Sequence, residues 1–531
     1  VTVKEITRED PSFLVPLDEM APLCHVIDKE LEIIGSLSYL SGSKFLQLRS
    51  RVVVSNDTKS PLEVIYRSPT SDFGAPVILG PGKVAAVPIL AMRAGHFQFR
   101  PAALPDNGGD ATTLGANAVY EWSIPGCRLR KNMHRAKTEG FVTSCTFAGD
   151  PNALPYPDPL YFVANFAVSV VPKRPDSLSC TVHVAPSVVL ENALYVDLAY
   201  RLSCGGATTA AAGTLKCGER VEVSAYAATQ ALCLSIKIDG YQWSDNYFSI
   251  NKGTGTTAIP VKDVNDQTLT LEAYVSKTAL GTRKVHIYCP HWLVNKTGLR
   301  LLYKERHSLS KKDRLGPNQS DKLHEQWTLQ GSPSRWYSSD RSVIQTMARP
   351  YMFSFSGKMS SRRRLHVRIA NSQWSDGIVL LTEGDLGGIE IPDIKTPGIS
   401  NGLRLFELVA ESRRGPGLCW RTVVTTFSPR FVLVNWTGSP LEYMQEKYPE
   451  QEYLLPGENL PFHWPNRTLK RRLRVRVATE QETKVIESRS VKGESPGMVL
   501  PPTCLSGSID ITALGKYVAL VPVQNEAEAA A

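Results

Sequence analysis

The strongest constraint on this chain is a block that occurs four times along it, because internal repeats dictate a modular architecture. The blocks read RVVVSNDTKSPLEVIY, SVVLENALYVDLAY, HWLVNKTGLRLLYK and FVLVNWTGSPLEYM. Each has an apolar run, one asparagine, a turn-like stretch and a second apolar run that ends near an aromatic residue. The repeated asparagines are Asn56, Asn192, Asn295 and Asn435. Their recurrence predicts four related modules.

A second block recurs downstream of the first three asparagines. It reads VYEWSIPG, GYQWSDNYFSI and NSQWSDGIVLL, and its tryptophans are Trp122, Trp243 and Trp374. The fourth module keeps a strand-like run at this place, LRVRVATEQETKVIES, but lacks the Trp-Ser pair. A large aromatic residue that recurs in phase predicts a core anchor. An exposed aromatic platform for a ligand is the alternative.

The pattern between these blocks predicts strands. Apolar residues alternate, or run four to eight long between clusters of Gly, Pro, Asn and Ser, which is typical of short strands. The best helix candidate is DEMAPLCHVIDKELEII at 18–34. We expect an all-β fold, a tandem array of β-sandwich-like repeat modules stacked into an elongated or curved arm. The expected boundaries are an N-terminal lead-in at 1–45, repeat 1 at 46–175, repeat 2 at 176–284, repeat 3 at 285–422, and repeat 4 with the start of a following linker at 423–531.

The repeated asparagine has two competing explanations. Its carboxamide carries donors and an acceptor, so it can tie a turn to a strand that lacks a ladder partner. Three of the four asparagines also begin N-x-S/T sequons, as do Asn318 and Asn466, which would indicate glycosylation in a secreted protein. Asn192 is followed by Ala and Leu and keeps its asparagine without a sequon. The pattern favours a structural staple and leaves open a second role in shaping a ligand groove.

Charge and hydropathy exclude some classes of protein. The chain has 60 basic and 51 acidic residues and a formal charge of +9, a mild excess, so we expect no nucleic-acid partner. Its longest apolar run, at 84–92, is far shorter than the about 20 residues of a membrane span. The densest basic clusters continue into alternating strands and predict either a solvated sheet face or a contact with anionic lipid headgroups. These clusters are Arg362, Arg363, Arg364 and Lys470, Arg471, Arg472.

Catalytic and metal-binding signals are thin. The ten cysteines are scattered without a C-x-x-C pair, so we expect small core residues in a reducing compartment, although disulfides stay formally open. Cys289 and His291 lack a second ligand pair, and no H-E-x-x-H or G-x-S-x-G motif occurs, so we expect no metal, no cofactor and no enzyme. The GPGKV at 80–84 is expected to be a turn. The LPYPDPL segment, with Pro155, Pro157 and Pro159, predicts a stiff linker or a ligand-like segment.

The segments CPHWLVNKTGLRLLYKE and FSPRFVLVNWTGSPLEYMQE resemble the asparagine-centred repeats of the adaptor-binding domain of the vacuolar protein sorting thirteen family. The resemblance extends over most of the chain, from about residue 45 to 500. It maps the family's characteristic asparagine onto Asn56, Asn192, Asn295 and Asn435. That domain has six repeats and four are visible here, so the chain resembles the first four, as a piece of a longer protein.

The resemblance implies a non-enzymatic interaction module that recruits a very long lipid-transfer protein to organelle membranes. Its implied partners are adaptors with Pro-x-Pro motifs and the rest of the same long chain, and its implied place is cytoplasmic, peripheral at membrane contact sites. In that family the Pro-x-Pro groove lies in the last repeats, so this chain would be the arm that positions it. The residues leave two alternatives: a secreted β-repeat adhesion or lectin-like protein, and a binder of anionic lipid surfaces.

Overall fold

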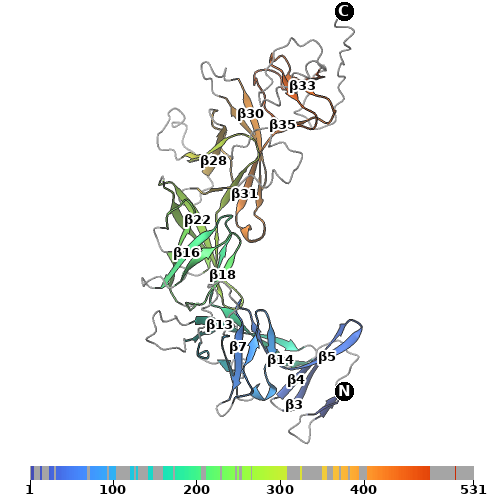
Figure 1. Cartoon of the computed structure of the whole chain (residues 1–531), viewed down its shortest axis with the longest axis vertical. Coiled ribbons are helices and arrows are strands. Elements are labelled where there is room, and N and C mark those ends of the chain that lie inside the picture. The colour runs from blue at the N-terminus through green and yellow to red at the C-terminus, as the bar shows by residue number, and fades with distance from the viewer. Residues whose placement is uncertain are drawn as a thin grey trace, which may run out of the picture. The chain divides into compact units, whose positions relative to one another are not determined.

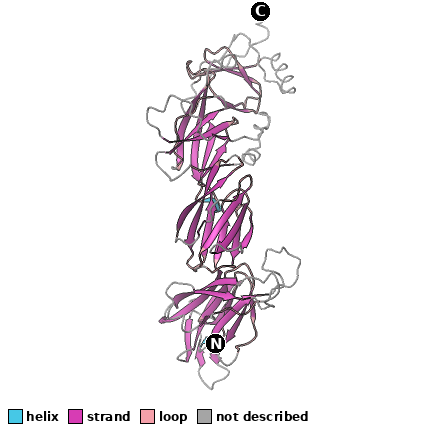
Figure 2. Cartoon of the chain, turned by 90° about the vertical axis from the view of Figure 1, so that its left-hand side faces the viewer, coloured by secondary structure: helices cyan, strands magenta, loops and turns pink. Residues whose placement is uncertain are grey.

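The computed structural model describes residues 2–4, 12–14, 23–28, 31–68, 72–92, 95–102, 120–124, 127–128, 141–146, 160–171, 174–204, 211–227, 230–244, 248–249, 254–264, 266–307, 323–325, 350–355, 363–369, 372–380, 383–393, 403–478 and 509. Strands dominate these residues, as Figures 1 and 2 show, and two short 3-10 turns are their only helical elements. The expected all-β repeat fold is confirmed. Within this part of the chain, no helix is long and apolar enough to cross a membrane.

The chain divides into two compact units, each described here by itself. One comprises 1–264 and 271–288, and the other 265–270 and 289–531. The first unit contains the N-terminal strands with repeats 1 and 2, and the second contains repeats 3 and 4.

The N-terminal strands correct one expectation. The described residues of the segment at 18–34 are not helical but belong to a three-stranded antiparallel sheet, whose strands are β3 (Leu23–Asp28), β4 (Leu31–Leu40) and β5 (Ser43–Ser50). The side chains of Ile33, Ile34 and Leu37 are buried, and pairing of β4 with both neighbours outweighs the weak local helix preference. Two shorter strands, β1 (Thr2–Lys4) and β2 (Ser12–Leu14), pair with each other.

Repeat 1 closes a sandwich around a continuous core. Its elements are β6 (Val52–Asn56), β7 (Leu62–Arg67), β8 (Val77–Leu79), β9 (Val84–Ala86), η1 (Ile89–Met92), β10 (His96–Pro101), β11 (Cys127–Arg128), β12 (Phe141–Cys145), β13 (Leu160–Val171) and β14 (Arg174–Pro186). The two sheets have the orders β12-β13-β14-β6-β9 and β11-β10-β7-β8. Phe99 and Phe162 from opposite sheets meet edge to face, with ring centroids 5.4 Å apart.

Repeat 2 has the same plan. Its strands are β15 (Val188–Asn192), β16 (Leu198–Cys204), β17 (Ala211–Leu215), β18 (Arg220–Val223), β19 (Leu232–Ile238), β20 (Phe248–Ser249), β21 (Gly255–Lys262), β22 (Thr268–Lys277) and β23 (Arg283–Tyr288). Their orders are β18-β15-β23-β22-β21 and β17-β16-β19-β20. Alternate residues of β19 and β22 are buried, as the period of a strand requires.

Repeat 3 again pairs two sheets over a shared core. Its elements are β24 (His291–Asn295), β25 (Leu301–His307), β26 (Leu323–Glu325), β27 (Tyr351–Phe353), β28 (Arg363–Ile369), β29 (Gly384–Pro392), β30 (Leu405–Arg414), η4 (Gly417–Cys419) and β31 (Val423–Pro429). The sheet orders are β27-β24-β31-β30-β29 and β26-β25-β28. Tyr303, Phe353 and Phe427 are buried in the core between them.

Repeat 4 is smaller within the described residues. Its strands are β32 (Phe431–Val434), β33 (Leu441–Gln445), β34 (Glu452–Leu454), β35 (Asn459–Phe462) and β36 (Leu473–Val477). They form a β32-β35 pair and a β34-β33-β36 sheet around Trp464, which is fully buried. The rings of Phe462 and Trp464 meet edge to face at 4.9 Å.

A parallel strand pair closes each of the first three repeats. The last strand returns beside the asparagine strand, which places Asn56 opposite Val184, Asn192 opposite Ile287, and Asn295 opposite Phe427. The amide after each asparagine donates a 2.8 Å hydrogen bond to the carbonyl of that opposite residue. Each closing strand therefore continues past the expected boundaries at 175, 284 and 422, to Pro186, Tyr288 and Pro429.

Candidate functional site

The asparagine of each repeat lies at the end of a strand, where the ladder stops and the turn begins. Asn56 is fully buried, and its Nδ2 donates hydrogen bonds of 2.8 Å to the carbonyls of both Ser60 and Leu79. Its Oδ1 accepts from the amide of Thr58 at 3.0 Å and from the Thr58 hydroxyl at 2.7 Å. The carboxamide thus satisfies four groups and ties the turn after β6 to the end of β8. We call this arrangement the asparagine box.

The box recurs in the other three repeats. Nδ2 of Asn295 donates to the Leu299 carbonyl at 2.7 Å, and Nδ2 of Asn435 donates to the carbonyls of Ser439 and Leu454 at 2.8 Å. In repeat 2, Nδ2 of Asn192 reaches the carbonyls of Val196 at 2.9 Å and Leu215 at 3.1 Å. All four asparagine side chains are at most 2 % exposed.

The threonine of each sequon belongs to the box. Thr297 and Thr437 donate their hydroxyls to Oδ1 of Asn295 and Asn435 at 2.7 and 2.8 Å, as Thr58 does to Asn56. In repeat 2, where leucine stands at this place, the amide of Leu194 alone bonds Oδ1. A glycan attaches through the asparagine Nδ2, and this atom is buried and hydrogen-bonded in all three sequon boxes. The folded chain therefore offers no glycosylation site at them. Asn318 lies outside the described residues.

A glycine turn completes the box, and the sequence did carry its signal. The amides of Gly82, Gly218 and Gly457 donate to the carbonyls of Asn56, Asn192 and Asn435 at 2.7, 3.1 and 2.8 Å. Each glycine has a positive φ, 67°, 73° and 75°, which favours glycine. Each also lies three residues after the leucine whose carbonyl accepts from Nδ2. The segments LGPGK, LKCGE and LLPGE share this spacing. The GPGKV turn is thus one wall of the first box.

In the Trp-Ser pairs, the serine is buried more deeply than the tryptophan that was expected as a core anchor. Trp122, Trp243 and Trp374 are half-buried. The following serines are buried, and each forms two hydrogen bonds with one strand residue. The serine hydroxyl accepts from the amide of that residue, and the serine amide donates to its carbonyl, an arrangement that we call the serine clip. The hydroxyls accept from Phe99, Ile236 and Val367 at 3.1, 3.2 and 3.0 Å, and the serine amides donate to the same three carbonyls at 2.9, 2.9 and 2.8 Å.

The indoles lie at the module surface beneath cationic side chains. The guanidinium carbons of Arg100, Arg201 and Arg368 are 4.5, 3.8 and 4.8 Å from the ring centroids of Trp122, Trp243 and Trp374. These distances suit cation–π attraction, which favours a half-exposed indole because one ring face is covered by the charged group. In each Trp-Ser pair, the buried serine therefore bonds the backbone of a strand, and the tryptophan ring lies at the surface beneath an arginine.

The second basic cluster is tied into the protein. Glu407 of β30 is buried, and its Oε1 accepts from Nη1 of Arg471 at 2.7 Å, while its Oε2 accepts from Nε1 of Trp464 at 2.8 Å. Nη2 of Arg471 also donates to Oε1 of Glu390 at 3.0 Å. Arg471 and Trp464 thus join repeat 4 to repeat 3 through one buried carboxylate. A membrane would have to compete with two carboxylates for Arg471.

The other basic residues have mixed surroundings. Lys470 and Arg472 are exposed, and Arg364 is half-buried. Arg364 packs against the backbone at Gly377, where an added Cβ would lie 2.7 Å from the Arg364 Cβ. Arg362, the Arg363 side chain, and Pro155, Pro157 and Pro159 lie outside the described residues.

An apolar stripe is exposed where repeat 4 begins. Val432 and Val434 of β32 are 50 % and 48 % exposed, and Trp436, which directly follows the box asparagine, is 90 % exposed. These three residues alternate along one face, as strand geometry predicts. Among the described residues β32 pairs with β35 alone, whereas the asparagine strands β6, β15 and β24 each have neighbours on both sides. We call Val432, Val434 and Trp436 the β32 stripe.

The buried cysteines suit a structural role. Cys127, Cys145, Cys180 and Cys289 are buried and unbridged. Burial raises the pKa of the Cys145 and Cys180 thiols to about 12, so neither is a thiolate at neutral pH. Thiols in this state are small core residues and not nucleophiles.

Comparison with known proteins adds an independent finding. The family model for the vacuolar-sorting associated protein 13, adaptor binding domain, matches residues 35–487. The chain is 24 % identical over 324 residues to the intermembrane lipid transfer protein tipC of Dictyostelium discoideum, covering 56 % of this chain and 8 % of that protein. It is 24 % identical over 458 residues to the intermembrane lipid transfer protein VPS13D of Homo sapiens, covering 82 % of this chain and 10 % of that protein. The chain thus spans a tenth or less of these curated relatives.

Proposed function

The chain belongs to the adaptor-binding-domain family of vacuolar-sorting associated protein 13, and from this premise we propose that it is a non-enzymatic recruitment module. In this proposal it binds adaptor proteins through short Pro-x-Pro motifs on the cytoplasmic face of an organelle membrane. The rest of the same long chain carries lipid between membranes. The relatives' description as intermembrane lipid transfer proteins supports this assignment.

The observation that carries a binding role is the β32 stripe. An exposed strand edge can accept an extended peptide through main-chain hydrogen bonds, and side chains beside it give specificity. In repeats 1 to 3 the residue after the asparagine, Asp57, Ala193 or Lys296, donates its amide to a closing strand. Trp436 is the equivalent residue of repeat 4, and its amide makes no such bond among the described residues. A flat indole beside this edge suits proline, because proline presents an apolar ring in a preformed extended backbone.

The chain's own later residues are the rival occupant of this edge. The closing strands of repeats 1 and 3 end in VHVAP and TTFSP, that of repeat 2 ends in VHIY before Cys-Pro, and the sequence contains a related YVALVP at 517–522. If that segment covers β32, an added peptide cannot bind there. The adaptor groove would then belong to repeats beyond this chain, and the chain would serve as the arm that positions it.

Fluorescence polarisation separates these arrangements. A labelled Pro-x-Pro peptide is titrated with the wild-type chain, with Trp436→Ala, and with Trp420→Ala as a control for loss of another exposed tryptophan, 52 % accessible. We expect saturable binding that weakens at least about tenfold in Trp436→Ala and is unchanged in Trp420→Ala. Absence of binding by the folded chain would reject a working groove in these four repeats.

The two alternatives have less support. The buried Nδ2 atoms of three sequon asparagines remove the main reason for a secreted, glycosylated protein. Pairing of Arg471 with Glu407 and Glu390 lowers the charge available to an anionic membrane. Flotation with vesicles that contain phosphatidylserine tests the lipid alternative: strong binding that falls steeply with added salt would favour it over adaptor recruitment.

A further inference from the structure

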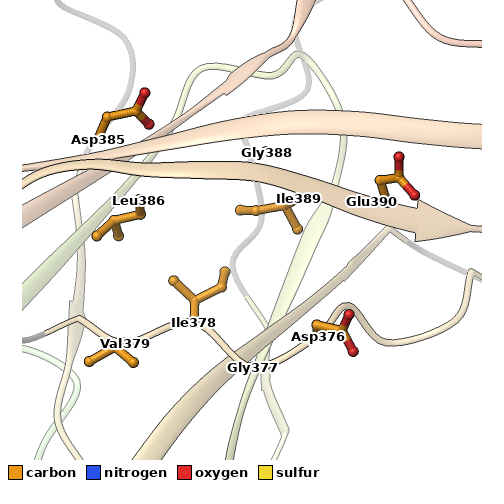
Figure 3. A pocket seen from close by; sticks show the side chains of 9 residues that line it. All are labelled: Asp376, Gly377, Ile378, Val379, Asp385, Leu386, Gly388, Ile389 and Glu390. Carbon is orange, nitrogen blue, oxygen red and sulfur yellow. The ribbon is translucent and has the colours of Figure 1, made fainter.

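A groove opens in repeat 3, and none of the residues that line it belongs to the β32 stripe. It has a volume of about 690 Å³ and lies between β29 and the segment at 376–379 that follows the Trp-Ser pair. Figure 3 shows Leu386 and Ile389 of β29 facing Ile378 and Val379 across it, with the carboxylates of Asp376, Asp385 and Glu390 at its margins. The groove thus has an apolar floor and an acidic rim.

One wall of the groove is a sheet edge. Among the described residues β29 is last in its sheet and pairs with β30 alone. On the opposite wall, Ile378 forms a bridge with Leu365 that extends the other sheet of the sandwich. At one end of the groove the amide of Gln373 donates to the Pro392 carbonyl at 2.8 Å and joins the two walls. No other described strand pairs with this edge of β29, and a free strand edge is a template for another strand.

The sequence of β29 suits the close approach of a second backbone. GDLGGIEIP contains three glycines, and its register shifts between Asp385 and Gly388, which is a bulge. Gly387 within the bulge has a φ of 85°. Bulges redirect side chains, and strand glycines commonly mark places where a ligand or backbone comes near. The bulge leaves Leu386 facing the groove and removes side-chain bulk from the edge.

The rim carries negative charge that the described residues do not neutralise. Glu390 is paired with Arg471 at 3.0 Å, and Arg430 beside Gly388 is drawn toward Glu407 at 3.6 Å. Asp376 and Asp385 are both exposed, and neither has an ion-pair partner among the residues that the structure describes. Asp385 accepts only the amide of Gly387, at 2.8 Å. On a chain with net positive charge, the carboxylates of Asp376 and Asp385 give this groove a margin that attracts cations.

We propose that this groove docks an extended segment of a partner protein in which Lys or Arg alternates with aliphatic residues. The segment adds to β29 as a strand through main-chain hydrogen bonds. Its aliphatic side chains rest on Ile378, Val379 and Leu386, and its cations reach Asp376 and Asp385. This site is separate from Pro-x-Pro recognition, because a basic segment is needed here and proline would remove the amide hydrogens that bond the edge.

Binding of a labelled eight-residue peptide of alternating lysine and valine, measured by fluorescence polarisation, tests the proposal. The double variant Asp376→Asn/Asp385→Asn keeps the oxygen that bonds Gly387 and removes both charges. We expect it to bind about tenfold more weakly than the wild type. The matched control, Glu121→Gln/Asp239→Asn, removes two exposed charges from unit 1 and should bind as the wild type does. Equal affinities in all three chains would overturn the proposal.

Peptide variants test strand addition separately from charge. One peptide is N-methylated on its valine amides and a second on its lysine amides, so each loses the hydrogens along one edge. We expect one of them to lose binding at least about tenfold and the other to keep it, because only one edge faces β29. Retention of full affinity by both would reject strand addition. These outcomes do not depend on the β32 stripe, whose Trp436→Ala variant should bind the basic peptide normally.

Discussion

The hydroxyl of Thr297 donates a 2.7 Å hydrogen bond to Oδ1 of Asn295, inside a turn where both residues are buried. The same hydroxyl accepts from the amide of Leu299 at 3.1 Å. Asparagine and threonine therefore act as one unit that replaces the hydrogen bonds missing where the strand ends. An N-x-T sequence arises here from turn chemistry, without any requirement for a glycan.

The first prediction concerns the box asparagine. Asn295→Ala leaves the Leu299 carbonyl and the Thr297 amide without their partner, so we expect the free energy of unfolding of unit 2 to fall by about 2–3 kcal/mol. Asn295→Asp should cost at least as much, since it places a carboxylate oxygen against a carbonyl. Urea denaturation followed by tryptophan fluorescence measures both. As a control, Thr297→Val removes one hydroxyl and should cost about 1 kcal/mol. An Asn295→Ala variant as stable as the wild type would contradict the staple.

Much of this could be predicted from the sequence, because the boxes use short-range chemistry. The positions of Asn56, Asn192, Asn295 and Asn435 followed from repetition, and the loss of the sequon at Asn192 already separated the amide from a glycan. The strand content followed from period-two alternation. Glycine spacing after a leucine, as in LGPGK and LLPGE, was visible too, but its link to an asparagine more than 20 residues earlier requires the fold.

Long-range features were not predictable in the same way. A tryptophan that recurs in phase indicates a common role, yet periodicity does not say which neighbour is buried, and here the serine is. The parallel pairing that joins residues such as Asn56 and Val184 could not be foreseen, because sequence patterns carry no register across such a distance. The acidic groove depends on a bulge at Asp385 and on a sheet edge, which only the pairing of strands defines.

The second prediction concerns the serine clip. Ser375 is buried, its hydroxyl accepts from the Val367 amide at 3.0 Å, and it donates to the Asp376 carbonyl at 2.9 Å. Ser375→Ala leaves the Val367 amide unpaired in the core, so we expect a loss of about 1–3 kcal/mol in unit 2. Ser439→Ala is the control, because no described residue bonds the Ser439 hydroxyl. Urea titration compares them, and equal midpoints in both variants would show that the clip does not stabilise the module.

The third prediction concerns the carboxylate that joins repeats 3 and 4. Glu407→Ala leaves the Trp464 indole nitrogen without an acceptor and leaves Arg471 with Glu390 alone, so we expect it to destabilise unit 2 by about 3 kcal/mol. A double-mutant cycle with Arg471→Ala should give a coupling energy of about 1–2 kcal/mol. The exposed pair of Arg414 and Glu383 serves as the comparison and should couple by less than about 0.5 kcal/mol. A coupling energy between Glu407 and Arg471 no larger than this would show that the buried ion pair does not stabilise unit 2.

The last prediction is a loss of stability in acid that begins with His291. This residue of β24 is 2 % exposed, and its ring meets the Phe355 ring edge to face at 5.4 Å. Burial lowers its pKa from 6.5 to about 4, because an imidazolium in this apolar place loses its hydration. Above about pH 6.5 the residue is neutral in the folded and the unfolded chain and does not affect the equilibrium.

Between pH 6.5 and pH 4 the unfolded chain binds a proton at this histidine that the folded chain does not. The free energy of unfolding must therefore decrease as pH falls through this window, by about 3 kcal/mol for His291. Burial also lowers the pKa of His463 to about 4, so part of the acid sensitivity should persist when His291 is replaced. Urea denaturation at pH 7 and pH 4.5 compares the wild type with His291→Leu. We expect the variant to lose about 2 kcal/mol less than the wild type between the two values. An identical loss in both chains would mean that His291 is protonated in the folded state, and that its buried site admits a charge despite the lost hydration.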